Sequence, residues 1–363
     1  MNVKKVLVVD DSAFMRKLIS EFLSGHPQLE VIAFGRNGHD AVKKALELKP
    51  DVITLDIEMP EMDGLAALKT IMEKQPCPIV MLSSLTKEGT ETTLKAIELG
   101  AVDFVAKPSG TISLDLHKVK DVLIEKVLAA SKANISMVPA VSKKPGVIQP
   151  PAEREYAAVN STHSEMRAKR MDKLVLIATS TGGPRALQHV VTKLPASLPA
   201  PVVIVQHMPP GFTKSLSERL DSLSDVRVKE GEDGEILKNG TVYIAPGGKH
   251  LRLKKTGMSI VIALDEQTPE GGHRPAANVT FRSAAAFSDL EKIAVIMTGM
   301  GSDGAEGLIK LKETGAVKAI AEAKETCVVY GMPKAAIATH LVDDVVPVDD
   351  IASKIVKHVY NKR

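Results

Sequence analysis

The chain of 363 residues is longer than one hydrophobic core usually serves, which predicts two domains, and its composition of 44% hydrophobic and 25% charged residues excludes a wholly disordered or fibrous chain. A formal net charge of +3 is too small to draw the whole protein onto nucleic acid or an anionic membrane. No stretch resembles a secretory signal or a membrane helix, and the distant Cys77 and Cys327 form neither a metal-ligand motif nor a disulfide framework, so we expect a cytoplasmic protein.

The first 130 residues alternate short β-branched runs with helical patterns. The runs that we predict as strands are 6–9, 31–34, 52–55, 79–82 and 102–105. Such alternation indicates a flavodoxin-like, doubly wound parallel sheet of five strands in the order 2-1-3-4-5, with helices on both faces. The first helix is expected to bury a stripe formed by Phe14, Leu18 and Phe22, backed by Met15 and Ile19. This first domain is assigned residues 1–130.

Acidic side chains follow two of these strands. Asp10 and Asp11 end the first strand and Asp56 ends the third, so all three carboxylates are expected beside one crevice. A hard divalent cation such as Mg²⁺ relieves the repulsion between them. Ser83 ends the fourth strand and Lys107 the fifth, where both can contact phosphoryl oxygens. Each residue alone has an ordinary alternative as a helix cap, turn or loop residue, but their joint placement favours a phosphate-accepting magnesium site.

Residues 1–125 resemble the receiver domain of two-component response regulators. The matching segments are Val8-Val9-Asp10-Asp11-Ser12, Leu55-Asp56-Ile57-Glu58-Met59-Pro60, Met81-Leu82-Ser83-Ser84 and Lys107-Pro108. The resemblance implies that Asp56 accepts a phosphoryl group from a histidine kinase and that Asp10 and Asp11 hold Mg²⁺ with it.

The same resemblance concerns regulation. It implies that Ser83 and Phe104 form a switch pair, with Lys107 nearby. We also expect a cis bond between Lys107 and Pro108, since proline amides have ready access to that form.

Residues 131–170 break the pattern with prolines and polar runs, including Val138-Pro139-Ala140 and Gln149-Pro150-Pro151. Too few apolar groups are present to offset the entropy of ordering, so we predict a linker. A basic cluster toward its end is interpreted as a solvated face rather than as a contact for an acidic partner.

From 171 to 360 strand and helix patterns resume. The predicted strands are 174–178, 202–205, 242–245, 260–264, 293–297 and 317–321. They indicate a second α/β domain with a mostly parallel sheet. Turn signals at Lys238-Asn239-Gly240 and Lys255-Thr256-Gly257 predict an antiparallel edge within 231–264.

A serine turn follows the first strand of this domain, in Thr179-Ser180-Thr181-Gly182-Gly183-Pro184. On a strand–turn–helix unit Ser180 projects its hydroxyl beyond the sheet, the N–H of Thr181 can stabilise an oxyanion, and Gly182 lets a substrate approach. A helix cap and a phosphate-binding glycine loop are alternatives, although the segment lacks the spacing of a dinucleotide fingerprint and the lysine of a P-loop. The motif alone does not decide between them.

A histidine and an aspartate follow two other strands of the domain. His207 comes after 202–205 and Asp303 after 293–297, so both are expected at the same sheet edge as Ser180. In such a triad His207 takes the serine proton and Asp303 stabilises the imidazolium. Singly, a loop histidine and a capping box formed by Asp303 and Glu306 are ordinary structural features. The chain order Ser, His, Asp differs from chymotrypsin, subtilisin and the α/β-hydrolases.

Residues 172–350 resemble the catalytic domain of the CheB family of chemotaxis methylesterases. The matching segments are Ser180-Thr181-Gly182-Gly183-Pro184, Gln206-His207-Met208-Pro209-Pro210, Tyr243-Ile244-Ala245-Pro246-Gly247, His273-Arg274-Pro275 and Thr298-Gly299-Met300-Gly301-Ser302-Asp303-Gly304. Departures from the family pattern are Ala178, Thr179 and Ser302. None of them removes a triad group.

The resemblance implies phosphorylation-regulated hydrolysis of glutamate γ-methyl esters on chemoreceptors, with release of methanol during chemotactic adaptation, and in some members deamidation of glutamine. It implies that Thr181, Gly182 and Met300 support the oxyanion or substrate and that ester hydrolysis needs no cofactor. The expected partners are a chemotaxis histidine kinase and methyl-accepting receptors, without nucleic acid and without direct insertion into the membrane.

Two alternatives stay open. The second domain is either a DNA- or protein-binding output domain without chemistry, or an esterase or amidase with another substrate. The absence of a helix-turn-helix signature and of a strong basic stripe weighs against a DNA-binding domain.

Overall fold

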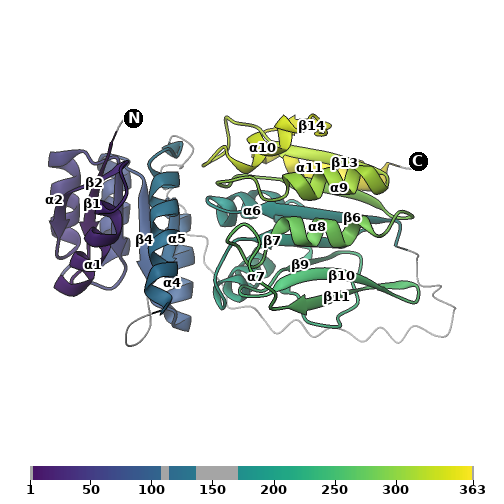
Figure 1. Ribbon diagram of the computed structural model, residues 1–363, viewed down its shortest axis with the longest axis horizontal. Coiled ribbons are helices and arrows are strands. Elements are labelled where there is room, and N and C mark those ends of the chain that lie inside the picture. The colour runs from purple at the N-terminus through teal and green to yellow at the C-terminus, as the bar shows by residue number, and fades with distance from the viewer. Residues whose placement is uncertain (1–2, 108–113, 136–170, 362–363) are drawn as a thin grey trace.

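The computed structural model describes residues 3–107, 114–135 and 171–361. They form two α/β domains that lie side by side, the first in purple and blue and the second in teal to yellow (Figure 1). Most of the predicted linker, and Pro108 with its predicted cis bond, fall outside the described residues. Among the described helices, none combines the length and apolar character needed to cross a membrane.

The first domain alternates strands and helices throughout. Its elements are β1 Lys4–Val9, α1 Ala13–Ser24, β2 Leu29–Gly35, α2 Gly38–Leu48, β3 Val52–Asp56, α3 Gly64–Lys74, β4 Ile79–Ser83, α4 Lys87–Glu98, β5 Asp103–Ala106 and α5 Leu114–Ala130. The five strands pair in parallel in the order β2-β1-β3-β4-β5, which confirms the predicted topology.

The strands of the first domain are apolar because both faces of the sheet are covered. Alternate strand residues pack under α1 and α5 on one face and under α2, α3 and α4 on the other. The predicted stripe of α1 is wrong at Phe14, which is 65% exposed, whereas Ile19 and Leu23 are buried. Met15, Ile19 and Leu23, which lie one position further along at the same four-residue spacing, form the stripe that faces the sheet instead.

The second domain contains a larger sheet and a separate hairpin. Its elements are β6 Lys173–Thr179, α6 Gly183–Val191, β7 Val202–Gln206, α7 Phe212–Leu223, β8 Arg227–Glu230, β9 Thr241–Ile244, β10 His250–Thr256, β11 Ser259–Asp265, α8 Ala277–Ala285, β12 Glu291–Ile296, α9 Ala305–Thr314, β13 Val317–Glu322, α10 Met332–Ala338, β14 Asp344–Val346 and α11 Val348–Tyr360.

The large sheet is parallel in the order β14-β13-β12-β6-β7-β9-β8. The predicted antiparallel pair is β10 with β11, joined by a turn at Gly257 with φ +61°, and it forms its own two-stranded sheet. Helices α6, α7 and α11 cover one face of the large sheet, while α8, α9, α10 and the hairpin cover the other. Strands β12, β6 and β7 are adjacent, so the three predicted site segments leave one edge together.

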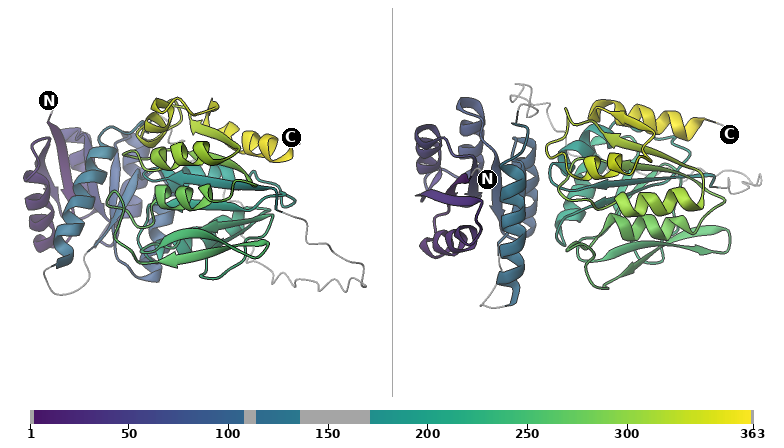
Figure 2. Two further views of the ribbon diagram at one scale, coloured as in Figure 1. Left: turned by 45° about the vertical axis from the view of Figure 1, so that its right-hand side comes forward. Right: turned by 45° about the horizontal axis from the view of Figure 1, so that its top comes forward.

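The α4 and α5 side of the first domain faces the second domain in all three views (Figures 1 and 2). The apolar core under α4 continues into the core under α6 and α7. Two aromatic rings stack across the boundary, Phe104 of β5 on Phe212 of α7, with centroids 4.3 Å apart. Arg219 of α7 also pairs with Glu98 of α4 at 2.8 Å.

Candidate active site

The turn between β6 and α6 carries the predicted nucleophile, Ser180, which has 8% of its surface exposed. The N–H of Ser180 donates to the Thr298 carbonyl at 3.0 Å, and the N–H of Gly183 donates to the Ser180 carbonyl at 2.8 Å. From the strand on the other side, Gln206 Nε2 donates to the same Ser180 carbonyl at 2.9 Å. Hydrogen bonds to two neighbouring strands therefore fix the backbone of the turn.

A glycine is required two residues after the serine. Gly182 precedes α6 as its N-cap with φ +78°, and a Cβ there would lie 2.5 Å from the Cβ of Val328. We expect Gly182→Ala to destabilise the folded domain by about 1–2 kcal/mol from the backbone strain alone, with the clash adding to it. Urea denaturation of the purified variant measures the loss. Unchanged stability would show that the turn relaxes freely around the new methyl group.

The structure brings the three predicted side chains into one row. Ser180 Oγ lies 3.2 Å from His207 Nδ1, and His207 Nε2 lies 2.8 Å from Asp303 Oδ2. With its proton on the nitrogen that faces the carboxylate, His207 presents an unprotonated Nδ1 to the serine hydroxyl. In chymotrypsin-like triads Nε2 of the histidine faces the serine and Nδ1 faces the aspartate. Here the two ring nitrogens are exchanged, but the order of the hydrogen-bonded side chains, serine to histidine to aspartate, is the same.

Asp303 is held by the start of a helix other than its own. The N–H of Ala277 donates to Asp303 Oδ2 at 2.6 Å, and the N–H of Asn278 donates to Oδ1 at 2.8 Å, both at the first turn of α8. Burial by itself would raise the pKa of Asp303, but hydrogen bonds from His207 and from these amides lower it. The carboxyl group is therefore ionised at neutral pH. It caps α8, and the capping box at α9 that the sequence offered as an alternative does not form.

His273 stacks on the ring of His207, with centroids 3.9 Å apart and planes 13° apart. Burial, followed by the neighbouring His207, lowers the pKa of His273 to about 4, so His273 is neutral at pH 7. The motif that contains His273 is visible in the sequence, but its contact with His207 joins segments 66 residues apart and no local pattern indicates it.

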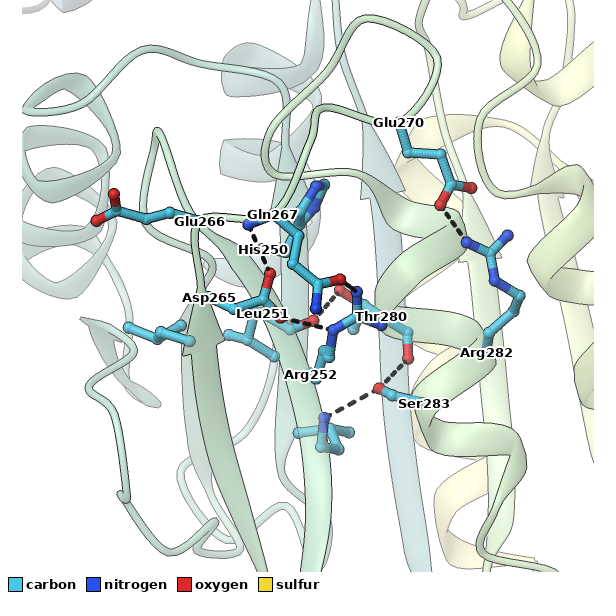
Figure 3. A network of polar contacts seen from close by, with 12 residues as sticks. His250, Leu251, Arg252, Asp265, Glu266, Gln267, Glu270, Thr280, Arg282 and Ser283 are labelled. Atoms are coloured by element: carbon cyan, nitrogen blue, oxygen red, sulfur yellow. Dashed lines mark hydrogen bonds and ion pairs between the residues drawn. The ribbon is translucent and has the colours of Figure 1, made fainter.

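The loop that carries His273 is braced by the hairpin and α8 (Figure 3). Arg252 of β10 contacts Asp265 Oδ2 at 2.6 Å and Gln267 Oε1 at 2.9 Å, and Arg282 of α8 pairs with Glu270. A further bond, from Thr280 Oγ1 to the Leu251 carbonyl at 2.7 Å, ties α8 to the hairpin. These bonds hold the wall of the site against the sheet edge.

Two backbone amides near Ser180 remain available to a substrate. Among the described residues, the N–H groups of Thr181 and Met300 donate no hydrogen bond. Thr181 follows β6, the strand that leads into the Ser180 turn, and Met300 follows the adjacent strand β12. An N–H without a partner is free to donate, and the position of these two suits a developing oxyanion.

A cavity of about 200 Å³ lies over the row and is lined by both domains. The second domain contributes Ser180, His207 and His273, and the first contributes Phe104 and Glu125. Next to it, Thr181 Oγ1 donates to Asp103 Oδ2 of the first domain at 2.6 Å. The hydroxyl beside the nucleophile is thus bound by the neighbouring domain.

The acidic cluster of the first domain also forms as expected. Asp10, Asp11 and Asp56 each offer an oxygen, and these atoms lie within 4.8 Å of one another. Lys107 Nζ lies 2.7 Å from Asp56 Oδ2 and 3.1 Å from Asp10 Oδ2. An all-oxygen donor set with this spacing fits Mg²⁺.

Asp56 is buried, and this burial, with repulsion from Asp10, raises its pKa to about 6 although Lys107 opposes the shift. Because the folded pKa exceeds the ordinary value of 3.8, the free energy of unfolding should fall as the pH rises from about 4 to about 6, by on the order of 3 kcal/mol. We expect Asp56→Asn to abolish this fall in buffer without divalent cations. Urea denaturation at pH 4 and pH 7 tests it, and an identical pH dependence in both proteins would contradict it.

The predicted switch residues occupy different surroundings. Ser83 Oγ accepts from Thr93 Oγ1 at 2.6 Å and donates to the Gly89 carbonyl at 3.2 Å, so it is bonded to α4. Phe104 is buried at the domain boundary, where Lys126 Nζ lies 4.8 Å from its ring centroid. One residue of the predicted pair therefore contacts α4 and the other contacts the second domain.

Fold and site together define a class, the response regulators that carry an α/β output domain with a Ser-His-Asp row behind a receiver. Family models match the receiver domain at residues 6–117 and the CheB methylesterase at residues 175–355. The chain belongs to the CheB methylesterase family. This membership supports the enzymatic interpretation over a DNA- or protein-binding output domain.

Individual relatives resemble the chain over nearly its full length. It is 57% identical over 357 residues to a protein-glutamate methylesterase/protein-glutamine glutaminase of Geobacillus kaustophilus, covering 98% of this chain and 99% of that one. It is 51% identical to the protein of the same name from Bacillus subtilis, covering 99% of both. The crystal structure of the Thermotoga maritima CheB methylesterase catalytic domain matches with 50% identity and a TM-score of 0.50, over 51% of this chain and 98% of that one.

Proposed function

We propose that the chain hydrolyses γ-methyl esters of glutamate on the cytoplasmic helices of chemoreceptors, releasing methanol, and that it also deamidates glutamine there. The row Ser180, His207 and Asp303 is the observation that carries this proposal. The names of relatives that match the full chain support the choice of substrate. We assign residues 1–130 to the receiver domain, 131–170 to the linker and 171–360 to the catalytic domain of a cytoplasmic enzyme.

Each group of the row has one role in the proposed reaction. Ser180 Oγ attacks the γ-carbonyl carbon while His207 Nδ1 takes its proton. The imidazolium then protonates the departing methanol or ammonia, which leaves an acyl ester on Ser180. Water, deprotonated by the same nitrogen, attacks this ester and frees the glutamate. Ionised Asp303 stabilises the imidazolium in both halves without accepting a proton itself.

The oxyanion of each tetrahedral intermediate is placed near the amides of Thr181 and Met300. The hydrogen bonds of the turn hold the Thr181 amide. The Gly299–Met300 peptide is held through the Gly299 carbonyl, which accepts from the N–H groups of Gly331 and Met332 at 3.0 and 2.8 Å, so little reorganisation is needed during reaction. Gly182, which has no side chain, allows the substrate to approach this backbone.

Asp56 is proposed as the phosphorylation site, with a chemotaxis histidine kinase as phosphodonor. Asp10, Asp11 and Asp56 would hold Mg²⁺, which supplies charge neutralisation for phosphoryl transfer when bound. Lys107 then contacts the phosphoryl oxygens. The added charge acts on Ser83 and Phe104, and loosened packing at the domain boundary uncovers Ser180.

Methanol release from membranes that contain methylated chemoreceptors tests the proposal. The full chain, with a small-molecule phosphodonor and Mg²⁺, should release methanol, and receptors with glutamine at the methylation sites should release ammonia. If a serine-reactive phosphonate labels Ser180 but no methanol appears, the enzyme acts on another ester.

A further inference from the structure

A buried carboxyl group lies two strands away from the nucleophile. Glu322 ends β13 and is 0% exposed. Its Oε2 accepts from the N–H of Thr298 at 2.8 Å, and its Oε1 accepts from Thr326 Oγ1 at 3.0 Å. Neither donor is charged, and burial raises the pKa of Glu322 to about 7. Burying an acid beside neutral partners costs stability, which calls for a functional reason.

Thr298 connects this carboxyl group to the nucleophile turn. Its carbonyl accepts from the N–H of Ser180 and from Thr179 Oγ1, each at 3.0 Å. Its hydroxyl donates to the Thr181 carbonyl at 3.0 Å and accepts from the N–H of Val329 at 3.0 Å. One residue therefore binds the backbone on both sides of Ser180.

We propose that Glu322 is a positioning residue for the hydrolytic reaction, which holds the backbone at Thr298 and, through the carbonyl and hydroxyl of Thr298, aims Ser180 Oγ and the Thr181 amide. This inference rests on the proposed role of Ser180 as nucleophile. Strands β13, β12 and β6 are adjacent, so the bonds run across the sheet edge from Glu322 to Ser180.

The position needs an acceptor of a particular length rather than a charge. Glutamine keeps an oxygen at the same distance from Cα, so it can still accept from the Thr298 N–H. Leucine leaves that N–H unpaired in a dry site, which favours a shift of the backbone at Thr298, including the carbonyl of the next peptide group that accepts from Ser180. Aspartate keeps the carboxyl group but withdraws it by one methylene. A shift of about 1 Å at a nucleophile is enough for a loss on the order of 10²-fold.

The test compares Glu322→Gln, Glu322→Leu and Glu322→Asp in the full chain. The first measurement is the rate at which a serine-reactive phosphonate labels Ser180, which requires no receptor. The second is kcat and KM for methanol release. Leu311→Ala, in the core of the same domain, serves as control because it loses stability without removing a hydrogen bond to Thr298 or to the turn.

We expect the leucine and aspartate variants to label about 10²-fold more slowly, with kcat reduced alike and KM nearly unchanged, while glutamine restores the parent rate. If the Glu322→Leu variant does not fold, the labelling rate of the Glu322→Asp variant tests the inference by itself. Labelling of the leucine and aspartate variants at the parent rate, failure of glutamine to restore it, or equal slowing in Leu311→Ala would overturn the inference. If the phosphonate does not label the parent protein, both the proposed nucleophile and this inference are wrong. If it labels the parent protein but no methanol is released, only the proposed substrate is wrong.

Discussion

Replacing Ser180 with alanine is expected to lower the rate of methanol release by on the order of 10⁶-fold, if the row acts as a unit. This substitution removes only the hydroxyl group. The proposed proton transfer begins along the hydrogen bond from that hydroxyl to His207 Nδ1, which is 3.2 Å long. Residual catalysis would come from the amides of Thr181 and Met300. The measurement is methanol release under saturating phosphodonor.

The neighbouring members of the row provide graded comparisons. His207→Ala should cost about as much as Ser180→Ala, and Asp303→Ala somewhat less, on the order of 10⁴-fold. Ser302→Ala is the matched control, since Ser302 is exposed beside Asp303. If the Ser180→Ala variant kept most of the parent activity, the proposed covalent mechanism would be wrong.

Replacing Asp56 with asparagine is expected to abolish stimulation by phosphodonor, whereas the parent should be stimulated by about 5- to 150-fold, the usual range of coupling between two sites. The physical reason is the boundary between the domains, where Asp103 binds Thr181 and Phe104 stacks on Phe212. An asparagine at 56 accepts no phosphoryl group, so nothing biases that boundary toward opening.

The control for this prediction is Asp63→Asn. Asp63 caps α3 through the N–H of Ala66 at 2.7 Å, and asparagine caps a helix about as well. Activity with and without phosphodonor should match the parent. Equal stimulation of Asp56→Asn and the parent would mean that the switch does not start at this carboxylate.

Strands that are buried on both faces could be predicted from the sequence, because a short continuous apolar run such as 174–178 is stable only where both of its faces are covered. Short edge strands could not. Arg227–Glu230 is polar at three of four positions, and Asp344–Val346 has three residues, so their pairing depends on neighbours already in place. The exposure of Phe14 was missed because the apolar residues of α1 fill two neighbouring rows with the same four-residue spacing, and the spacing alone does not tell which row faces the sheet.

The row itself was predictable because a parallel sheet sends all its strand ends to one edge. Its supports were not. Asn278 accepts from the N–H groups of Gly304 and Gly307, and Glu322 accepts from Thr298, each across gaps of more than 20 residues that leave no periodic signal. His273 had a motif but no partner until the tertiary structure placed it on His207.

The stacked rings at the domain boundary set an energetic threshold for access to the cavity. Phe104 and Phe212 are 1% and 0% exposed, and wetting a buried phenylalanine costs about 1.5–3 kcal/mol. Spontaneous parting of the domains should therefore be rare, and background demethylation in resting cells correspondingly slow. A receptor that covers Phe212 as it docks would lower this threshold, so substrate and phosphorylation should each strengthen the effect of the other.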